Sequence, residues 1–356
     1  MRMIRAGVVA TILLAGVNAA ASQDVLKVAV GQRGGWEQCV SELGQNAGFF
    51  KKHNLALDIL YTQGSAETLQ SVISASVDIG IGLGTHAGLG AYAKGAPIRA
   101  IGASFTSADD QFYYVPTDSP IRTMADADGK TIATSTTGSA SHMFALALAK
   151  HFGVNLKPQP TGNYASTLTQ TLTKQVDIGF SQAPFNLTAV EEGKIRIVAR
   201  GRDVPALRNM TSRLIVANAD TLARRRETFV RFMRGFRETI DWLYSDPAAI
   251  AAYAAWSGLP ERIARQAPEF LTKDNLDPTR IAGLDGVMAD AVAFKYLPAP
   301  LTEAQLKELI QIPATGLLGR PLWAPSSGND RWAATRAAPT LTIARLTAGC
   351  GGRFRA

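Results

Sequence analysis

Thr68-Leu69 and Val77-Asp78-Ile79-Gly80 recur 99 residues further along the chain as Thr167-Leu168 and Val176-Asp177-Ile178-Gly179. In both copies an apolar-spaced segment precedes a short polar turn, a run of buried-type residues and a loop with Gly or Pro. This order predicts a helix, a turn, a strand and a loop, used twice in two similar α/β lobes. Open α/β sheets bind ligands in the loops at the carboxyl ends of their strands. The repeat therefore predicts two lobes that face each other and enclose a cleft, with one loop from each lobe lining it.

The first 21 residues are typical of an export signal. Arg2 and Arg5 form a positive start, residues 6–17 are an apolar run, and Ala19-Ala20-Ala21 offers a small-residue cleavage site. The apolar run is short for a membrane span, so an uncleaved anchor is the less favoured alternative. No Cys stands at the cleavage point, which argues against a lipoprotein. We therefore expect cleavage near Ala21 and a mature chain in the periplasm.

The positive charge of the chain lies mainly at its two ends. Of the formal net charge of +8, residues 1–21 contribute +2 and residues 325–356 contribute +4, which leaves +2 for the body. A nearly balanced body is not typical of a nucleic-acid binder. Residues 325–356 lack clear periodicity and are predicted to form a poorly ordered tail, with a functional basic tail as the alternative. The only two cysteines, Cys39 and Cys350, are too few for a disulfide framework or a Cys-based metal site, and their pairing stays open.

Strand-like and helix-like segments alternate in two blocks, and the chain after Thr221 is predicted to be all helix. Outside the repeats, strands are expected at Val25–Val30, Leu55–Tyr61, Ile98–Ser104, Thr131–Thr134, Ile195–Ala199 and Leu214–Ala217, and the first repeat strand at Val77–Ile81. Helices are expected at Gln38–Phe49, Ala87–Ala93 and Ala140–Phe152. We expect a first lobe from residues 24–108 and 214–322 and a second lobe from residues 109–213, joined by two extended crossovers.

The C-terminal helical part begins with an amphipathic segment. Its apolar face holds Phe229, Phe232, Met233, Phe236, Ile240 and Leu243. Arginines lie mostly on the opposite face, where solvent exposure is favoured over contact with an anionic membrane or a partner.

Motifs spread over roughly residues 25–320 resemble one known group of proteins. They are Ala47–Leu55, Gly64-Ser65, Val77–Gly82, Asp128–Ala133, Gly138–His142, Val176–Phe180 and Ala183-Pro184-Phe185. In this order they resemble the periplasmic solute-binding proteins of ABC importers, in the branch that handles nitrate, sulfonates, taurine and thiamine-type pyrimidines. The resemblance implies the type II periplasmic-binding-protein fold, in which two α/β sheets joined by two crossover strands close on a small solute. It also implies a membrane permease as partner; we expect a monomer that binds no nucleic acid.

The start of the predicted helix Ala140–Phe152 is the candidate anion site of the second lobe. Thr137, Gly138, Ser139 and Ser141 bring backbone amides, hydroxyls and the positive end of a helix dipole together. Ordinary N-capping by Ser or Thr needs no ligand and is the alternative interpretation. Ligand contact is favoured because Gly138-Ser139 follows the carboxyl end of a strand.

The facing loop of the first lobe is Gly84-Thr85-His86. His86 is either a donor to an oxyanion or an ordinary loop histidine, and the residues favour neither alternative. Gly35 would let a ligand approach the backbone closely, and the ring of Trp36 would offer it an aromatic surface. Trp36 fits a position in the core equally well. Ser65, on the loop that also holds Gln63, is a weaker candidate.

Three further candidates come from other loops. Gln182 and Phe185 follow the second repeat strand and supply an amide and an apolar surface, with core packing the favoured alternative for Phe185. Arg213 precedes a returning strand and is the most remote candidate, because arginine is usually exposed.

These observations predict an extracytoplasmic binding protein that delivers a small organic anion, a sulfonate or carboxylate, to an ABC transporter permease. A neutral thiamine-type pyrimidine is the alternative ligand. A pyrimidine-forming enzyme of the thiamine pathway shares the fold, but the chain has no Cys-rich run, no Gly-x-Ser-x-Gly elbow and no metal-ligand spacing among its four histidines. We therefore expect no catalysis, metal or cofactor. A ligand-sensing module is the third class, and no helix-turn-helix segment or second membrane span supports it.

Overall fold

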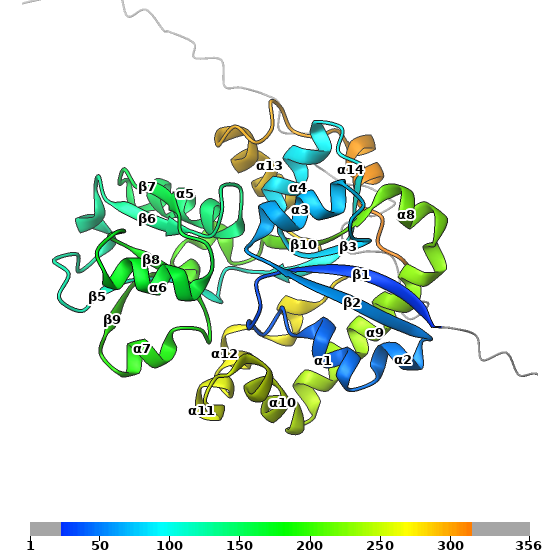
Figure 1. Cartoon of the computed structure of the whole chain (residues 1–356). Helices are drawn as coiled ribbons and strands as arrows, with labels where there is room; N and C mark the ends of the chain where they lie inside the picture. The colour runs from blue at the N-terminus through cyan, green and yellow to red at the C-terminus, as the bar shows by residue number, and fades with distance from the viewer. Residues whose placement is uncertain (1–22, 315–356) are drawn as a thin grey trace, which may run out of the picture. The chain divides into compact units, whose positions relative to one another are not determined.

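The computed structural model describes residues 23–314, so the predicted signal peptide and tail lie outside the described residues (Figure 1). The first lobe is built on a five-stranded sheet of order β2-β1-β3-β10-β4. Its strands are β1 (Asp24–Gly31), β2 (Leu55–Thr62), β3 (Ile79–Gly84), β4 (Ile98–Thr106) and β10 (Thr211–Asn218). β1 runs parallel to β2 and β3, whereas β10 runs antiparallel to β3 and β4. The sheet is therefore mixed.

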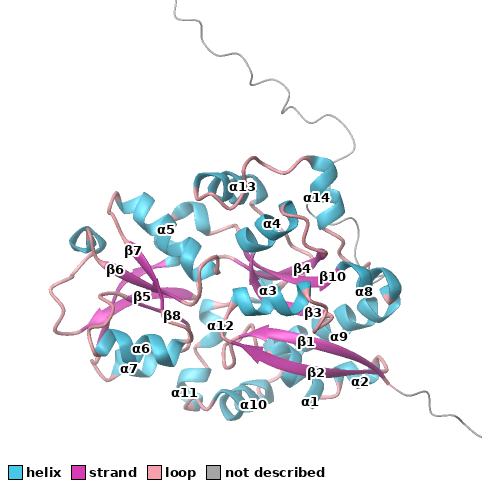
Figure 2. Ribbon diagram, turned by 45° about the horizontal axis from the view of Figure 1, so that its top comes forward, coloured by secondary structure: helices cyan, strands magenta, loops and turns pink. Residues whose placement is uncertain are grey.

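Helices cover both faces of this sheet (Figure 2). They are α1 (Val40–Asn46), α2 (Phe49–Lys52), α3 (Ser65–Ile73), α4 (Thr85–Ala93), α8 (Ala219–Arg224), α9 (Arg226–Ser245), α10 (Ala248–Ser257), α11 (Glu261–Ala264), α12 (Ala267–Phe270), the 3-10 helix η4 (Lys273–Leu276), α13 (Leu284–Ala293) and α14 (Glu303–Leu309). Side chains along β1 alternate between the faces: Leu26, Val28 and Val30 pack with α9, whereas Ala29 packs with α3.

The second lobe has two smaller sheets. β5 (Gln111–Pro116) lies between β8 (Gly179–Gln182) and β9 (Ile195–Arg200), antiparallel to both, and β6 (Thr131–Thr134) pairs in parallel with β7 (Lys157–Pro160). Its helices are α5 (Ala140–Phe152), α6 (Tyr164–Leu172), α7 (Leu187–Glu191) and the 3-10 helices η1 (Met124–Ala127), η2 (Gly201–Asp203) and η3 (Pro205–Leu207). The α/β class, the two crossovers and the helical C-terminal part are thus confirmed. The residue boundaries predicted for the lobes stay a prediction.

The sequence repeat corresponds to a repeated hydrogen-bond pattern. The N–H of Lys27 donates to Asp78 Oδ2 at 2.8 Å, and the N–H of Thr131 donates to Asp177 Oδ2 at 2.8 Å. Asp177 therefore fixes the start of β6, whereas Asp78 bonds β1 at Lys27, next to Val28, where β1 begins to pair with β3. Equivalent threonine pairs also lie at the two helix starts, Thr62 with Thr68 at 2.7 Å and Thr161 with Thr167 at 2.6 Å. Ala75 and Lys174 occupy the same left-handed turn position, with φ of 56° and 60°.

The bounds of several predicted elements differ from the structure. The helix expected over Gln38–Phe49 is shorter, since α1 ends at Asn46, before Gly48 with its φ of +84°. The strand expected over Leu214–Ala217 begins at Thr211, so Arg213 lies inside the strand that it was predicted to precede. The strand expected from Val77 begins at Ile79, because Asp78 belongs to the turn that bonds β1. The apolar face predicted from Phe229 to Leu243 is confirmed, since all six of its side chains are buried.

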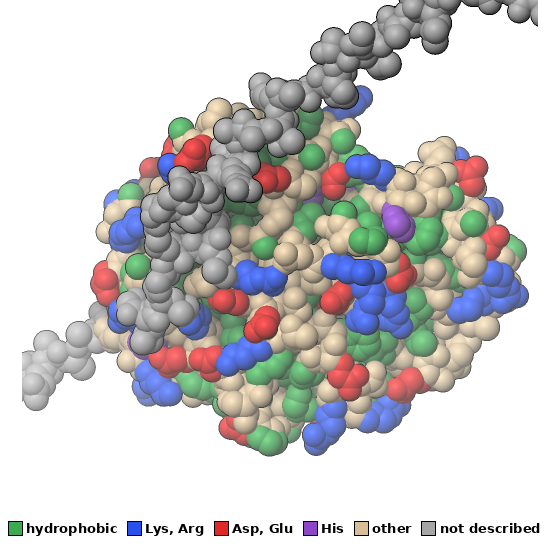
Figure 3. Space-filling model, turned by 180° about the vertical axis from the view of Figure 1, so that it is seen from behind, with side chains coloured by type: hydrophobic (Ala, Val, Ile, Leu, Met, Phe, Trp, Pro, Cys, Tyr) green, Lys and Arg blue, Asp and Glu red, His purple; other side chains and the backbone are tan. Residues whose placement is uncertain are grey.

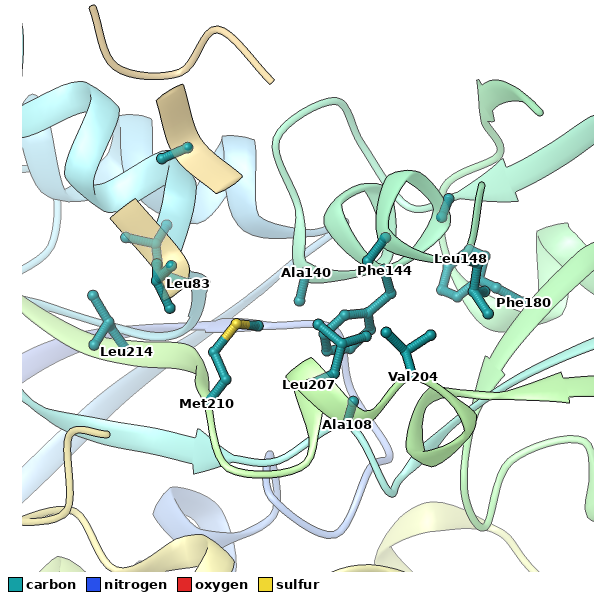
Figure 4. Close-up of a cluster of buried hydrophobic side chains, with 14 of the residues drawn as sticks. Leu83, Ala108, Ala140, Phe144, Leu148, Phe180, Val204, Leu207, Met210 and Leu214 are labelled. Atoms are coloured by element: carbon teal, nitrogen blue, oxygen red, sulfur yellow. The ribbon is translucent and has the colours of Figure 1, made fainter. Parts of the chain in front are cut away.

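One apolar cluster continues through the crossover into both lobes (Figure 4). Leu207 and Met210, between β9 and β10, lie between Leu83 and Leu214 of the first lobe and Phe144 of the second. The crossover between β9 and β10 is therefore packed and contains η2 and η3, whereas the sequence predicted an extended crossover here. On the face of the molecule that Figure 3 shows, basic and acidic side chains are interspersed. This agrees with the nearly balanced charge of the chain between its two ends. None of the described helices is long and apolar enough to span a bilayer.

We predict that the two repeated aspartates make similar contributions to stability. Asp78→Ala and Asp177→Ala should each lower the free energy of unfolding by about 1–3 kcal/mol, because a strand N–H loses a charged acceptor. Urea unfolding measures the loss. Asp118→Ala, which removes an exposed carboxylate on the second lobe, is the control and should leave stability unchanged within error. A loss at only one of the two sites would show that the repeats are not equivalent in energy.

Candidate functional site

A polar cavity of about 30 Å³ lies at the carboxyl ends of the strands, where loops of both lobes meet. Its polar side chains are four glutamines, four serines, one tyrosine and one arginine: Gln32, Gln38, Gln111, Gln182, Ser65, Ser135, Ser139, Ser141, Tyr164 and Arg213. Gly31, Gly64, Gly82, Ala140 and Phe180 complete the lining. Arg213 is the only charged residue in this lining. The cavity is therefore rich in neutral hydrogen-bonding groups around one cation.

The first-lobe side is fixed by Ser65, the first residue of α3. Its hydroxyl donates to the carbonyl of Gly82 at 3.3 Å and accepts from the N–H of Gly84 at 3.0 Å. Gly64, which precedes it, has a φ of +153° that favours glycine. This turn directs the N-terminus of α3 toward the cavity and ties it to the end of β3.

The second-lobe side is a cluster of serine hydroxyls at the start of α5. Ser139 caps the helix by accepting from the N–H of His142 at 3.2 Å. Ser141 Oγ accepts from the N–H of Ser135 at 2.9 Å and lies 2.9 Å from Ser139 Oγ. The N-capping that the sequence offered as an alternative is therefore present. It coexists with cavity lining, since Ser135, Ser139 and Ser141 all face the cavity.

Arg213 lies in β10 between two buried carboxylates. Its Nε donates to Glu37 Oε2 at 2.6 Å, and its Nη2 donates to Asp110 Oδ2. The ring of Phe105 lies below the guanidinium, 4.6 Å from its central carbon. These contacts fix two edges of the guanidinium, and no hydrogen bond to the described residues engages Nη1. Arg213 can thus present one rigid donor edge to a ligand.

The glutamines provide both free donors and free acceptors. Tyr164 donates its hydroxyl to Gln182 Oε1, and Gln182 Nε2 lies 3.5 Å from Gln38 Oε1 of the other lobe. Gln32 Oε1 and Gln111 Nε2 are buried without a hydrogen-bond partner among the described residues. Buried amide groups of this kind are unfavourable unless something pairs with them, so they are candidate ligand contacts.

The two lobes are in direct contact around the cavity. A Cβ at Gly84 would lie 3.0 Å from both the backbone nitrogen of Ala140 and the carbonyl oxygen of Gly138. Gly34 lies against the ring of Phe185, and Tyr296 of the first lobe bonds His142 Nδ1 of the second at 2.6 Å. The structure is a closed arrangement. A 30 Å³ cavity admits a water-sized group, so an organic ligand requires the lobes to part or the glutamine side chains to turn.

Four of the twelve predicted site residues line the cavity: Ser65, Ser139, Ser141 and Gln182. Gly35 and Gly84 lie close by, Gly35 beside Gln38 and Gln182 and Gly84 at the contact between the lobes. Thr137 and Gly138 belong to the same turn as Ser139 but do not line the cavity, and the N–H of Gly138 donates to His142 Nδ1 at 3.1 Å.

The other predicted residues lie behind the lining. Trp36 is in the core, where its Nε1 donates to Tyr244 at 3.0 Å and Tyr253 packs edge-on to its ring. Thr85 donates to the carbonyl of Thr211 at 2.7 Å, and His86 is buried one residue further into α4. Phe185 stacks on Tyr164, with the ring centroids 5.0 Å apart. It therefore supports the lining without belonging to it.

Sequence reasoning did not single out Gln32, Gln38, Gln111 or Ser135, and it ranked Arg213 lowest. Glutamine and serine carry no periodic or charge signal that would have found the first four. A signal was present for Arg213, because it is the one charged residue in the eight-residue strand Thr211–Asn218. All eight residues of that strand are buried.

Residues 43–250, more than half of the chain, match the family model described as NMT1/THI5 like. No curated protein sequence matches the chain. No group of three or more metal-ligating side chains is present among residues 23–314.

Several solved structures have the same fold. The alkanesulfonate-binding protein SsuA from Xanthomonas axonopodis pv. citri, bound to MOPS, has a TM-score of 0.65 at 19% identity and covers 82% of this chain and 100% of its own. The periplasmic aliphatic sulphonate binding protein SsuA from Escherichia coli has a TM-score of 0.63 at 20% identity, covering 88% and 99%. The periplasmic nitrate-binding protein NrtA from Synechocystis PCC 6803 has a TM-score of 0.64 at 12% identity, covering 81% and 86%. The predicted periplasmic-binding-protein fold is confirmed, and these neighbours are binding proteins rather than enzymes.

We predict that buried His86 makes stability depend on pH. Burial lowers the pKa of His86 to about 4, so between about pH 4 and the ordinary value near 6.5 the unfolded chain binds more protons than the folded one. Stability is therefore lost as the pH falls through 6.5. The free energy of unfolding should fall by about 1–2 kcal/mol between pH 7 and pH 5 from this group.

Urea unfolding at pH 7 and pH 5 measures this loss. His86→Gln should reduce it, whereas His151→Gln, at an exposed histidine of α5, should leave it as in the wild type. Equal losses in His86→Gln and the wild type would assign the pH dependence to other groups.

Proposed function

Because the chain belongs to the NMT1/THI5-like family, we propose that it is an extracytoplasmic solute-binding protein for a small organic anion of the sulfonate or carboxylate type. The lobes close on the anion, and the closed form delivers it to the permease of an ABC importer. The protein carries out no chemistry on the solute. The export signal predicted from residues 1–21 agrees with a periplasmic location.

The main support for this proposal is that the guanidinium of Arg213 and two helix N-termini lie at the same cavity. Arg213 lines the same cavity as Ser65, at the start of α3, and Ser139, at the start of α5. Helix N-termini carry a partial positive charge and free N–H groups, and hydroxyls add further donors. A sulfonate or carboxylate has oxygens for such donors. Three structural neighbours, which are sulfonate-binding or nitrate-binding proteins, support the same class of ligand.

A neutral pyrimidine is a second candidate, favoured by the glutamines. Gln32 offers an unpaired acceptor and Gln111 an unpaired donor, the complementary pair that a heterocycle with ring nitrogens and an amino group requires. The aromatic pair Tyr164 and Phe185 offers a surface near a planar ring. The pyrimidine differs from the anion in needing no contact with Arg213.

A thermal-shift screen distinguishes the two classes of ligand. The mature chain is heated with methanesulfonate, butanesulfonate, nitrate, acetate, benzoate and an aminopyrimidine, because a bound ligand raises the apparent stability. Stabilisation by the sulfonates or carboxylates supports the anion, and stabilisation by the aminopyrimidine alone supports the second candidate. The anion proposal fails if none of the sulfonates or carboxylates shifts the transition.

We predict that Ser139 contributes to affinity as well as to helix capping. Ser139→Ala should weaken binding of the stabilising anion by about tenfold, because a hydroxyl donor is lost from the cavity. Thr302→Ala is a matched control, since Thr302 caps α14 through its hydroxyl away from the cavity. Calorimetry should give wild-type affinity for the control. Equal affinities in Ser139→Ala and the control would remove Ser139 from the site.

We also predict that Gly84 limits how far the lobes close. In Gly84→Ala the added methyl meets the backbone of the second lobe at 3.0 Å, and overpacking of this kind costs about 1–3 kcal/mol, or roughly fivefold to 150-fold in affinity. Gly286→Ala, in α13 with no heavy atom within 4 Å of the added methyl, should bind as the wild type. Wild-type affinity in both variants would mean that the Gly84 contact is not part of the ligand-bound form.

A further inference from the structure

Three buried charged groups lie together beneath the cavity. Arg213 bonds Glu37 and Asp110, and the exposed fractions of the three side chains are 6%, 1% and 0%. Glu37 precedes α1 of the first lobe, Asp110 precedes β5 of the second, and Arg213 is in the strand that returns between them. With both carboxylates ionised, the cluster carries a net charge of −1. Such a charge is unfavourable for an anion that binds against Arg213.

The two carboxylates differ in how completely they are hydrogen-bonded. Glu37 Oε2 accepts from Arg213, and Glu37 Oε1 accepts from the hydroxyl of Ser104. Asp110 Oδ2 accepts from Arg213, but Asp110 Oδ1 is buried without a partner among the described residues. A buried carboxylate oxygen without a donor is costly when the group is ionised. Asp110 is therefore the member of the cluster that gains most from protonation, on Oδ1.

The surroundings of Asp110 agree with this assignment. Burial raises the pKa of Asp110 to about 6; Arg213 opposes this rise and the negative charge of Glu37 adds to it. The other titratable groups near Asp110 include Tyr113 of β5 and Tyr164 of α6, and burial raises the pKa of both further above neutrality. The adjacent Asp109 pairs with Arg202. The tyrosines stay protonated at neutral pH.

We propose that an anion entering this cavity is bound together with one proton, which Asp110 Oδ1 takes up from solvent. This inference rests on the proposed anion-binding function, and it adds that pH regulates the affinity of the site for the anion. The anion would bring the cluster to a charge of −2, and the proton restores it to −1. Binding and protonation are then linked: a lower pH strengthens anion binding, and a bound anion strengthens proton binding at Asp110. A neutral ligand requires no proton.

Isothermal titration calorimetry measures the coupled proton directly. Methanesulfonate, butanesulfonate, acetate and benzoate are titrated into the mature protein at pH 7.5 in imidazole and in Bis-Tris, because sulfonate buffers are themselves candidate ligands. The difference in apparent enthalpy between the two buffers gives the number of protons taken up. We expect close to one proton per anion, and an affinity that falls by up to about tenfold for each pH unit from 6.5 to 8.

Two variants assign the proton to a residue. Asp110→Asn removes the negative charge while keeping an acceptor for Arg213, so it should bind the anion without proton uptake, independently of pH and more tightly than the wild type at pH 8. Asp109→Asn is the matched control at the neighbouring, partly exposed carboxylate, and it should retain the wild-type proton uptake.

Each outcome decides between the two proposals. Anion binding by the wild type with equal enthalpies in the two buffers overturns the proton coupling, whether or not Asp110→Asn folds. Proton uptake that persists in folded Asp110→Asn assigns the proton to another group and overturns the role of Asp110. If none of the four anions binds even at pH 5.5, the anion-binding function itself fails, and the coupling fails with it.

Discussion

The ion pairs of Arg213 are the interaction on which the closed structure most depends. A guanidinium in a fully buried strand would be strongly unfavourable without compensation, and Glu37 and Asp110 supply it from the two segments that flank the cleft. Because the three charged groups come from the first-lobe loop, the second-lobe entry and the returning strand, none can move far without leaving another unpaired. The cluster thus fixes the geometry of the crossover and of the cavity floor together. With both carboxylates ionised, the cluster leaves no net positive charge beside the cavity, which is the basis of the proton coupling proposed above.

The repeated units place equivalent features on the two sides of this cluster. In each lobe an Asp accepts from a backbone N–H of a neighbouring strand, a threonine pair lies at the helix start, and a left-handed residue follows the helix. The helix starts themselves differ. α3 begins at Ser65 in the cavity, whereas the equivalent α6 begins at Tyr164, and the serine hydroxyls of the second lobe come from α5. The repeat helix therefore brings a serine to the cavity in the first lobe and a tyrosine in the second, where a different helix, α5, supplies the serines.

The fold could be predicted from the sequence because its signals are local. The repeat, the apolar face from Phe229 to Leu243 and the start of α5 depend on residues close in sequence. The end of the helix expected over Gln38–Phe49 was placed three residues too late, since α1 ends at Asn46, before the left-handed Gly48. The site was predicted less completely. Ser65, Ser139 and Gln182 follow strand ends, where the general rule for α/β sheets applies.

The remaining lining residues are brought together by tertiary packing. Gln38 and Gln111 carry no local signal, and the partners of Arg213 lie more than 100 residues away in sequence. Trp36, Thr85 and His86 have the chemistry of site residues, but their side chains are buried in the core, Thr85 and His86 in the first turn of α4. Residue type and position after a strand predict which loops approach the cavity. They do not predict which side chain of a loop faces inward.

The contacts that close the lobes are largely separate from the groups that face the cavity. Gly84 against the Gly138–Ala140 backbone, Gly34 against Phe185, and Tyr296 with His142 join the lobes directly. A ligand can shift an open-to-closed equilibrium only by its difference in affinity for the two forms. Since contacts between the lobes already contribute to the closed form, the ligand has to supply less of the free energy of closure. The cavity groups are then free to determine which solute is bound. An unpaired glutamine donor, an unpaired glutamine acceptor and one edge of Arg213 favour a solute by its hydrogen-bonding pattern and charge more than by its size.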